Sequence, residues 1–268
     1  MNIWDNIKKD FASGDPVIVD WALMKPDYLP FLLSVLYLLF VKLLGPNMMK
    51  GRKPFKLRIP MIVYNFALVF AYAACVTRVL YLCFTTNVYK YWCISGSARQ
   101  SPQIYEVVVI SWIIYLLKYV EYLDTIFFVL RKKYHQITTL HVFHHSLIPI
   151  CCWMVFRTEK SLFQVTPGII NGVVHVIMYT YYGLAAAGVK QEYLWWKKYL
   201  TRLQMAQFIV VIILQIYATH MGCYSSFISF YMVTFLCMSF FILFGNFYIQ
   251  TYNLSCKNGP RRSIFHID

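Results

Sequence analysis

Charged side chains are scarce in this chain of 268 residues, and acidic ones are the scarcest. Asp, Glu, Lys and Arg together make up 13% of the sequence, with only 11 acidic residues, whereas 59% of the residues are hydrophobic and 19% are aromatic. Soluble domains carry about 25% charged residues, and they could not hide so much apolar surface. The composition therefore excludes an ordinary soluble protein.

Three further absences narrow the organisation. The start, MNIWDNIKKDFASGDPVIVDW, has no compact apolar core followed by small residues, so we expect no cleaved signal peptide. The eight cysteines include no CxxC pair, which argues against a thiolate zinc site. No repeat and no low-complexity linker divides the chain. We therefore predict one membrane domain at 29–249, between a lumenal N-terminal segment at 1–28 and a cytosolic basic tail at 250–268.

Long apolar runs, in contrast, are abundant. A transmembrane helix needs roughly 20 mainly apolar residues to cross a hydrocarbon core about 30 Å thick. The candidate spans cover 29–44, 60–84, 104–117, 138–156, 165–189, 203–221 and 227–249. The sequence thus predicts an all-α integral membrane protein with seven transmembrane helices.

The basic residues, which give a net charge of +14, gather in alternate loops between these spans. With the N-terminus in the lumen, the cytosolic segments hold Lys50, Arg52, Lys53, Lys56, Arg58, Lys118, Arg131, Lys132, Lys133, Lys190, Lys197, Lys198, Lys257, Arg261 and Arg262. The positive-inside rule then gives a lumenal N-terminus, a cytosolic C-terminus and an odd number of spans. This distribution argues against a nucleic-acid partner. The bases either set topology alone or also meet an anionic cytosolic partner.

Two cysteines differ from the others, which lie mostly in spans as small apolar fillers. Cys93 and Cys223 both fall in lumenal loops, where the compartment is oxidising. We put forward a disulfide between them as a hypothesis.

Polar side chains inside the spans mark candidate functional positions, because they are unfavourable in a bilayer unless paired or hydrated. His141, His144 and His145 share one stripe of the fourth span. The fifth span carries a second stripe, in which polar and aromatic side chains alternate with apolar ones. It consists of Asn171, His175, Met178, Tyr179 and Tyr182.

Two more polar clusters fall at the same depth. The third span ends in KYVEYLDT, with Lys118, Glu121 and Thr125 on one face and Asp124 further round, and the sixth opens with Thr201, Gln204 and Gln207. The predicted topology places all four clusters in the cytosolic half of the membrane. They predict one polar chamber open to the cytosol.

Three interpretations fit such a chamber. A histidine-box metal site, as in a lipid desaturase or hydroxylase, needs about eight histidines, whereas only four of the seven here lie in the chamber. A non-enzymatic seven-helix transporter or receptor would use the polar groups as interhelical hydrogen bonds. Alternatively, an imidazole attacks a thioester and forms an acyl-imidazole. Asn171, Gln204 and Gln207 would then donate hydrogen bonds to the oxyanion.

The motifs KYVEYLDT, LHVFHH, NGVVHVIMYTYY and TRLQMAQ, in this order, resemble the four signature boxes of the ELO family, the elongases of very-long-chain fatty acids. The stretch LGPNMMKGRKPF…MIVYNF resembles the family's region into the second span. The resemblance implies a condensing enzyme, a 3-oxoacyl-CoA synthase of the endoplasmic reticulum. It joins long-chain acyl-CoA to malonyl-CoA without a metal or other cofactor, in a seven-helix fold with an acyl tunnel. It leaves open self-association and contact with other elongation-cycle enzymes.

Our assignment of roles goes beyond the resemblance. His144 or His145 takes the acyl group, beside His141, and His175 assists decarboxylation of malonyl-CoA or stabilises the enolate. Asn171 and Gln204 orient the thioester carbonyls. The remaining substrate-binding candidates are the polar residues Lys118, Glu121, Asp124, Tyr179, Tyr182 and Gln207, and the bases Lys132, Lys133, Lys197, Lys198 and Arg202 for the phosphates of coenzyme A. The tail, RRSIFHID, lacks the lysine-based retrieval signal of many members, so we expect retention in the endoplasmic reticulum through partners.

Overall fold

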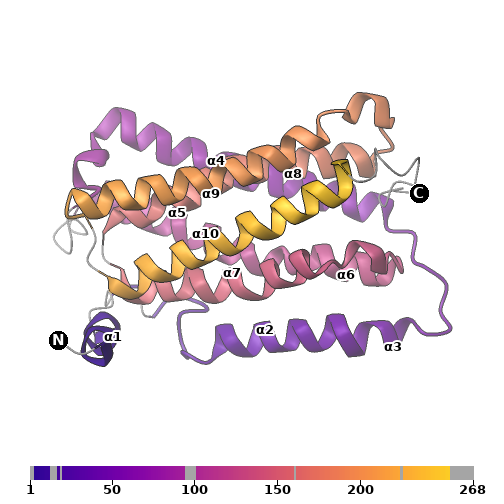
Figure 1. Ribbon diagram of the computed structural model, residues 1–268, viewed down its shortest axis with the longest axis horizontal. Coiled ribbons are helices and arrows are strands. Elements are labelled where there is room, and N and C mark those ends of the chain that lie inside the picture. Colours follow the sequence, from indigo (N-terminus) through magenta and orange to yellow (C-terminus); the bar gives the residue numbers. More distant parts are fainter. Residues whose placement is uncertain are drawn as a thin grey trace.

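The computed structural model describes residues 3–12, 17–18, 20–93, 101–159, 161–223 and 226–253. Its long helices run side by side (Figure 1). The α-helices are α1 (Ile3–Ala12), α2 (Leu29–Leu39), α3 (Gly45–Met49), α4 (Arg58–Thr86), α5 (Pro102–Val120), α6 (Tyr122–Leu130), α7 (Thr139–Thr158), α8 (Val165–Ala186), α9 (Lys197–His220) and α10 (Phe227–Tyr248). A π-helical turn, Phe40–Leu44, joins α2 to α3, and another, Ile249–Asn253, follows α10.

The predicted membrane-spanning architecture is confirmed. Six helical segments in the described part of the chain are long and apolar enough to cross a bilayer: Leu29–Met49, Arg58–Thr86, Thr139–Thr158, Val165–Ala186, Gln191–His220 and Phe227–Tyr252. The predicted span at 104–117 lies inside α5, which continues into α6 after a turn at Glu121. The tail predicted at 250–268 is described only as far as Asn253.

Several predicted boundaries differ from the helices by a few residues, and two of the differences have a clear local reason. The fifth span ends at Ala186 instead of residue 189, because Gly188 adopts a φ of +82°. Its N–H bonds to the Ala185 carbonyl and that of Val189 to the Leu184 carbonyl, which is the Schellman arrangement that ends a helix. The sixth span begins at Lys197 instead of residue 203, since its polar first turns are helical although they are not hydrophobic.

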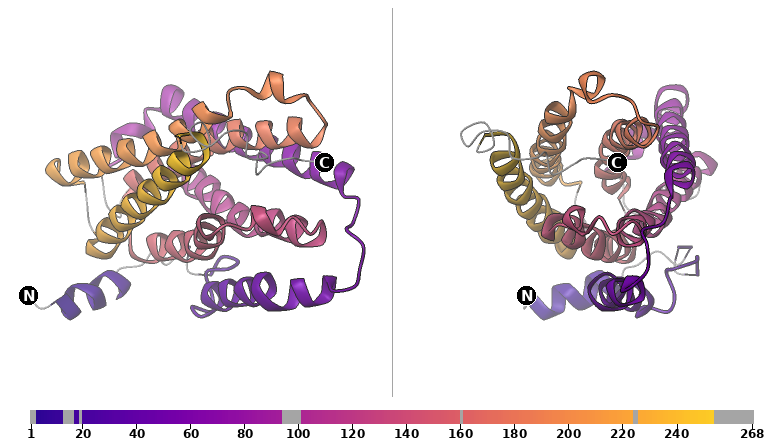
Figure 2. Two further views of the ribbon diagram at one scale, coloured as in Figure 1. Left: turned by 45° about the vertical axis from the view of Figure 1, so that its right-hand side comes forward. Right: turned by 90° about the vertical axis from the view of Figure 1, so that its right-hand side faces the viewer.

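Six of the helices close into a ring. Around it, α4 packs on α8, α8 on α9, α9 on α10, α10 on α7, α7 on α5, and α5 again on α4. The end-on view of Figure 2 shows this arrangement, with α2 outside it. Helices α4 and α8 approach closely at Gly172 of α8, where a Cβ would lie 2.9 Å from Cγ2 of Val76. Small residues allow such contacts between membrane helices, whose association depends on packing.

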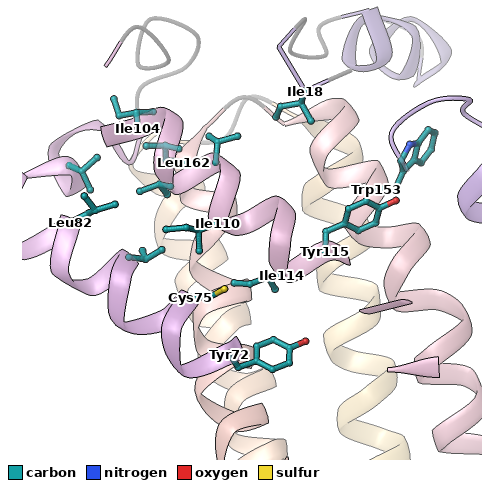
Figure 3. Packing of buried hydrophobic residues seen from close by; sticks show 14 of the residues in the cluster. Ile18, Tyr72, Cys75, Leu82, Ile104, Ile110, Ile114, Tyr115, Trp153 and Leu162 are labelled. Atoms are coloured by element: carbon teal, nitrogen blue, oxygen red, sulfur yellow. The ribbon is translucent and has the colours of Figure 1, made fainter. Parts of the chain in front are cut away.

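A large cluster of buried apolar side chains fills the interior between α4, α5, α7 and α8. Figure 3 shows it extending from Tyr72 to Ile104, Leu162 and Ile18. The helix ring is therefore packed in one half. Tyr179, one of the predicted site residues, belongs to this cluster.

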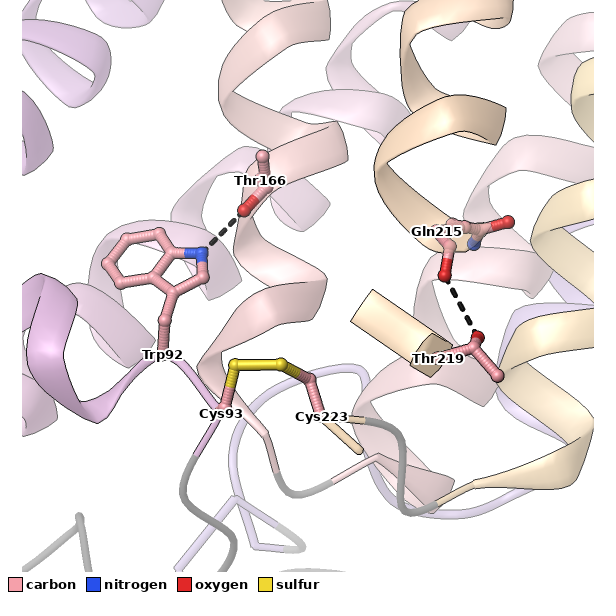
Figure 4. The surroundings of a disulfide bond; sticks show 6 residues. All are labelled: Trp92, Cys93, Thr166, Gln215, Thr219 and Cys223. Atoms are coloured by element: carbon pink, nitrogen blue, oxygen red, sulfur yellow. Dashed lines mark hydrogen bonds between the residues drawn. A yellow bond between two sulfur atoms is a disulfide. The ribbon is translucent and has the colours of Figure 1, made fainter. Parts of the chain in front are cut away.

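The two ends of the helix ring differ in chemistry. At one end, which we call the disulfide end, α1 lies near the start of α10, and a disulfide joins Cys93 to Cys223, the pair put forward from the sequence (Figure 4). Beside it, Trp92 Nε1 donates to Thr166 Oγ1 at 2.6 Å. The opposite, basic end holds the loops after α3, α6 and α8. These loops and the helix starts beside them carry Arg52, Lys53, Lys56, Arg58, Lys132, Lys133, Lys190, Lys197 and Lys198.

Candidate functional site

The three histidines of α7 stand at the start of that helix. Thr138 is its N-cap, and its hydroxyl accepts from the His141 backbone N–H at 3.2 Å. The His145 ring centroid is 4.3 Å from that of His141 and 5.1 Å from that of His144. On α8, His175 lies with its ring centroid 6.5 Å from that of His144. Four imidazoles from two helices therefore form one cluster.

Glu121, at the turn between α5 and α6, lies at the centre of the polar contacts. Its Oε1 is 3.0 Å from Lys118 Nζ, 2.5 Å from Tyr72 Oη and 2.9 Å from His175 Nδ1. The His175 contact is at ion-pair distance but does not meet the angle of a hydrogen bond. Glu121 is 1% exposed and Lys118 3%. A buried ion pair is tolerated where further hydrogen bonds satisfy its atoms, and the Tyr72 hydroxyl supplies one.

The same network reaches across the helix ring to α9. Lys118 Nζ also donates to Asn171 Oδ1 at 3.0 Å, and Asn171 Nδ2 donates to Gln207 Oε1 at 3.4 Å. Lys118 therefore fixes which way the Asn171 amide points. The N–H groups of the Asn171 amide face α9 and Gln207.

A second chain of contacts enters from α2, outside the helix ring. Tyr37 Oη lies 2.9 Å from Thr125 Oγ1, which lies 2.7 Å from His141 Nε2. Tyr37 and Thr125 are both buried. Close by, the Tyr179 hydroxyl donates to Asp124 Oδ2 at 2.8 Å. His141 is thus held at one ring nitrogen by the Thr125 hydroxyl, which in turn contacts the Tyr37 hydroxyl of α2.

Two cavities meet at these residues. A polar chamber of about 210 Å³ contains the histidines, Glu121 and Asp124 in its wall and extends toward Arg131 and Lys197 at the basic end. A second, mainly apolar cavity of about 200 Å³ runs from Lys118 toward Val165 and Ile18, in the direction of the disulfide end. We call it the apolar tunnel. Both are lined by His144, Asn171, Gln207 and Phe208.

His144 therefore occupies the junction of the chamber and the tunnel. The His144 side chain is partly exposed, whereas His145 is 7% exposed and lines only the chamber, not the tunnel. In the described part of the chain, neither ring nitrogen of His144 has a hydrogen-bond partner. An imidazole in this position is free to react with a group that spans both cavities.

Comparison with known proteins decides the family. The model of the ELO family (GNS1/SUR4) matches residues 21–260. Similar proteins include very long chain fatty acid elongase 1 of Homo sapiens, 37% identical over 97% of this chain and 93% of that protein. Elongase 7 of Rattus norvegicus is 39% identical over 79% of this chain and 74% of its own, and elongase 7 of Drosophila melanogaster is 37% identical over 90% and 73%. The chain belongs to the ELO family.

The four ELO boxes predicted from the sequence come together around the chamber. Of the predicted site residues, its wall contains Glu121, Asp124, His141, His144, His145, Asn171, His175, Tyr179, Tyr182, Lys197, Gln204 and Gln207. Lys118 borders the tunnel instead. Gln204 is away from the junction, and its Nε2 is 3.4 Å from Met178 Sδ.

Four of the five bases predicted to meet coenzyme A phosphates do not line either cavity. These are Lys132, Lys133, Lys198 and Arg202. Arg202 instead points at α10, where its Nε donates to Tyr248 Oη at 2.8 Å, and Lys198 lies over the Tyr199 ring. Lys197 does line the chamber, together with Arg131, which the sequence marked only as a topological charge.

Sequence reasoning missed Tyr72 and Tyr37. Both lie in apolar runs, where tyrosine reads as a packing residue, and their partners are on other helices. The geometry also gives no support to the alternative of a histidine-box metal site. Within the described residues, no three His, Cys, Asp or Glu side chains form a group that could hold a metal ion.

Proposed function

We propose that this ELO family member catalyses the condensing step of fatty-acid elongation. In this reaction, an acyl-CoA, malonyl-CoA and one proton give 3-oxoacyl-CoA, CO2 and free coenzyme A. The observation that carries the proposal is the position of His144 between an apolar tunnel, suited to an acyl chain, and a polar chamber, suited to a thioester and coenzyme A. The names of the relatives favour the same activity over a desaturase or a receptor.

The first step is transfer of the acyl group to His144. A ring nitrogen attacks the thioester carbonyl, the C–S bond breaks, and a C–N bond forms. The proton lost from the other ring nitrogen passes to the departing thiolate and yields free coenzyme A. The Asn171 amide, oriented by Lys118, donates to the carbonyl oxygen as negative charge develops there.

The second step makes the carbon–carbon bond. Malonyl-CoA loses CO2, and the electron pair of the broken bond forms an enolate, whose carbon attacks the acyl-imidazole. The C–N bond breaks, and His144 recovers its proton from the medium. His175, with Nδ1 turned to Glu121, offers its Nε2 to the thioester oxygen of the malonyl unit. In this scheme the histidines act directly, without a cofactor.

The basic end would face the cytosol, which supplies both coenzyme A thioesters. Its excess of bases agrees with the positive-inside rule. In this orientation α1 and the Cys93–Cys223 disulfide would lie on the oxidising lumenal side. Arg131 and Lys197 at the chamber mouth would contact the phosphates. We place the enzyme in the endoplasmic reticulum membrane, alongside the enzymes that reduce and dehydrate its product.

Two measurements on purified protein test the mechanism. Incubation with acyl-CoA alone should leave an acyl adduct on the peptide that contains His144, as seen by mass spectrometry. Labelled malonyl-CoA should then convert the adduct into 3-oxoacyl-CoA. His144→Ala should abolish the adduct and lower condensation at least about 10²-fold, the lower range for loss of a group that transfers protons or bonds.

The matched control is His135→Gln, which changes an exposed histidine in the loop before α7. It should leave adduct and condensation unchanged. Condensation at the normal rate with no adduct on any histidine would overturn the covalent step. Absence of 3-oxoacyl-CoA in every acyl length tried would overturn the proposed activity.

A further inference from the structure

The end of the apolar tunnel farthest from His144 includes a residue from outside the seven membrane segments. There, Glu159, Ser161 and Leu162 lie in the connection between α7 and α8, and Val165 begins α8, but Ile18 comes from the N-terminal segment. Ile18 is 1% exposed and packs in the apolar cluster at the same end as Leu162 (Figure 3). Ile18 therefore adds an apolar surface to this end of the tunnel.

The chain just after Ile18 is fixed to the helix ring through its backbone. Three consecutive carbonyls accept hydrogen bonds from aromatic side chains of α5 and α7. Trp112 Nε1 donates to Ala22 O at 3.0 Å, Tyr115 Oη to Leu23 O at 2.9 Å, and Trp153 Nε1 to Met24 O at 3.3 Å. Met24 is fully buried. A loop attached in this way cannot shift without losing several hydrogen bonds at once.

The chain before Ile18 is attached to a different helix. Asp10, at the end of α1, is 6% exposed, and its Oδ2 accepts from Ser226 Oγ at 3.2 Å and from the Ile228 backbone N–H at 3.0 Å. Ser226 is the N-cap of α10, where a negative charge is favourable. The N-terminal segment thus bridges α5, α7 and α10, which are three of the helices whose residues line the tunnel.

We infer that this segment, through Asp10, Ile18 and residues 22–24, forms the floor of the acyl tunnel, and that Ile18 is where the methyl end of the chain stops. The inference rests on the proposed function. At about 1.5 Å per residue, Glu159 at the end of α7 lies about 22 Å along the helix from His144. Ile18 therefore sets the longest straight acyl chain that fits between the floor and the reacting carbonyl.

Changes in the size of residue 18 test the floor. Ile18→Ala should shift the longest acyl-CoA that is elongated toward greater length, and Ile18→Trp should shift it toward shorter chains. The matched controls are Val17→Ala and Val17→Trp, at a neighbouring side chain that is 45% exposed and does not line the tunnel. Identical length profiles for wild type and both Ile18 variants would overturn the inference.

A second measurement does not depend on turnover. An acyl-CoA with a diazirine at its methyl end, of the longest length elongated or bound, should label the N-terminal peptide that contains Ile18. A much shorter analogue should label α7 or α10 near Cys151 or Cys237, which line the middle of the tunnel. Labelling at Ile18 without condensation would overturn the proposed activity but support the floor. Condensation with the long probe's label confined to other segments would overturn the floor alone.

Discussion

Tyr72, on α4, donates a hydrogen bond of 2.5 Å to Glu121, the residue at the turn between α5 and α6. This bond connects α4 to the carboxylate that contacts Lys118 and His175. His175 is therefore connected through Glu121 to Tyr72, a tyrosine that lies outside the four signature boxes. The contact also explains how a carboxylate that is only 1% exposed keeps enough partners in the membrane interior.

Tyr72→Phe removes this donor and changes little else in shape. Because a buried carboxylate loses a partner, we expect the free energy of unfolding in detergent to fall by about 1–3 kcal/mol, and condensation to slow. Thermal unfolding and the product assay measure the two effects. Tyr81→Phe is the control, since Tyr81 is on the same helix but 56% exposed. Equal behaviour of the two variants would contradict the role of the bond.

Lys118→Met should destabilise the protein by about 3–5 kcal/mol, because it leaves Glu121 as an uncompensated buried charge. Adding Glu121→Gln should restore part of this loss, and a double-mutant cycle measures the coupling. The pair Lys190–Glu192, with side chains 78% and 61% exposed, is the control and should couple by at most about 1 kcal/mol. Additive effects of Lys118→Met and Glu121→Gln would refute the coupling.

Thr125→Val removes the hydroxyl that contacts both Tyr37 and His141, while it keeps the volume of the side chain. A hydrogen bond contributes about 1 kcal/mol, so kcat should fall several-fold to about tenfold while KM for acyl-CoA stays near its normal value. Thr125→Ser should restore most of kcat, which a purely structural defect would not require. Steady-state kinetics separate the two constants. If Thr125→Val changed KM alone, the hydroxyl would not be positioning His141.

Gly172→Ala should force α8 away from α4, because the new Cβ would meet Val76 at 2.9 Å. We expect a loss of about 1–3 kcal/mol in unfolding free energy, the usual effect of overpacking. Val76→Ala in the same chain should relieve it. Gly168→Ala is the matched control on α8, where a Cβ has no neighbour within 4 Å. Thermal unfolding of the three variants and the wild type would show whether the contact decides the helix spacing.

Removing the disulfide should destabilise the disulfide end. Cys93→Ser opens a link between positions 130 residues apart, and bonds of this kind contribute about 2–4 kcal/mol. We expect a lower unfolding temperature and a changed mobility on a non-reducing gel. Cys83→Ser, at a free cysteine, should change neither. A wild-type protein whose mobility does not respond to reductant would contradict the bond.

The spans and the shared depth of the polar clusters could be predicted from the sequence, because both depend on the spacing of residues along single helices. His141 and His144 follow helical periodicity, and His175 could be placed from topology alone. Partners across helices could not be read in this way. Tyr72 and Tyr37 look apolar in a hydropathy pattern. Tyr72 meets Glu121 only because α4 packs in the helix ring, and Tyr37 meets Thr125 only because α2 docks on the outside of that ring.

Charge was a weaker guide to the chamber than polarity within the spans. Lys198 and Arg202 were chosen because they are basic and near the membrane surface, yet the direction of a side chain depends on its phase around α9. Lys197 points into the chamber, whereas Arg202 points at Tyr248. The N-terminal segment was predicted only as a lumenal segment before the membrane domain. Its composition gives no sign that three of its backbone carbonyls accept hydrogen bonds from α5 and α7.

The position of α2 has a consequence for biosynthesis. This helix is synthesised before every member of the helix ring, yet its Tyr37 hydroxyl ends a relay to His141 on α7. Segments generally fold from the N-terminus during synthesis, so α2 must wait in the bilayer until α7 has been inserted beside it. The contacts around His141 are then complete only when α2 docks on the assembled bundle, so docking of α2 would be a late step in the maturation of a nascent chain.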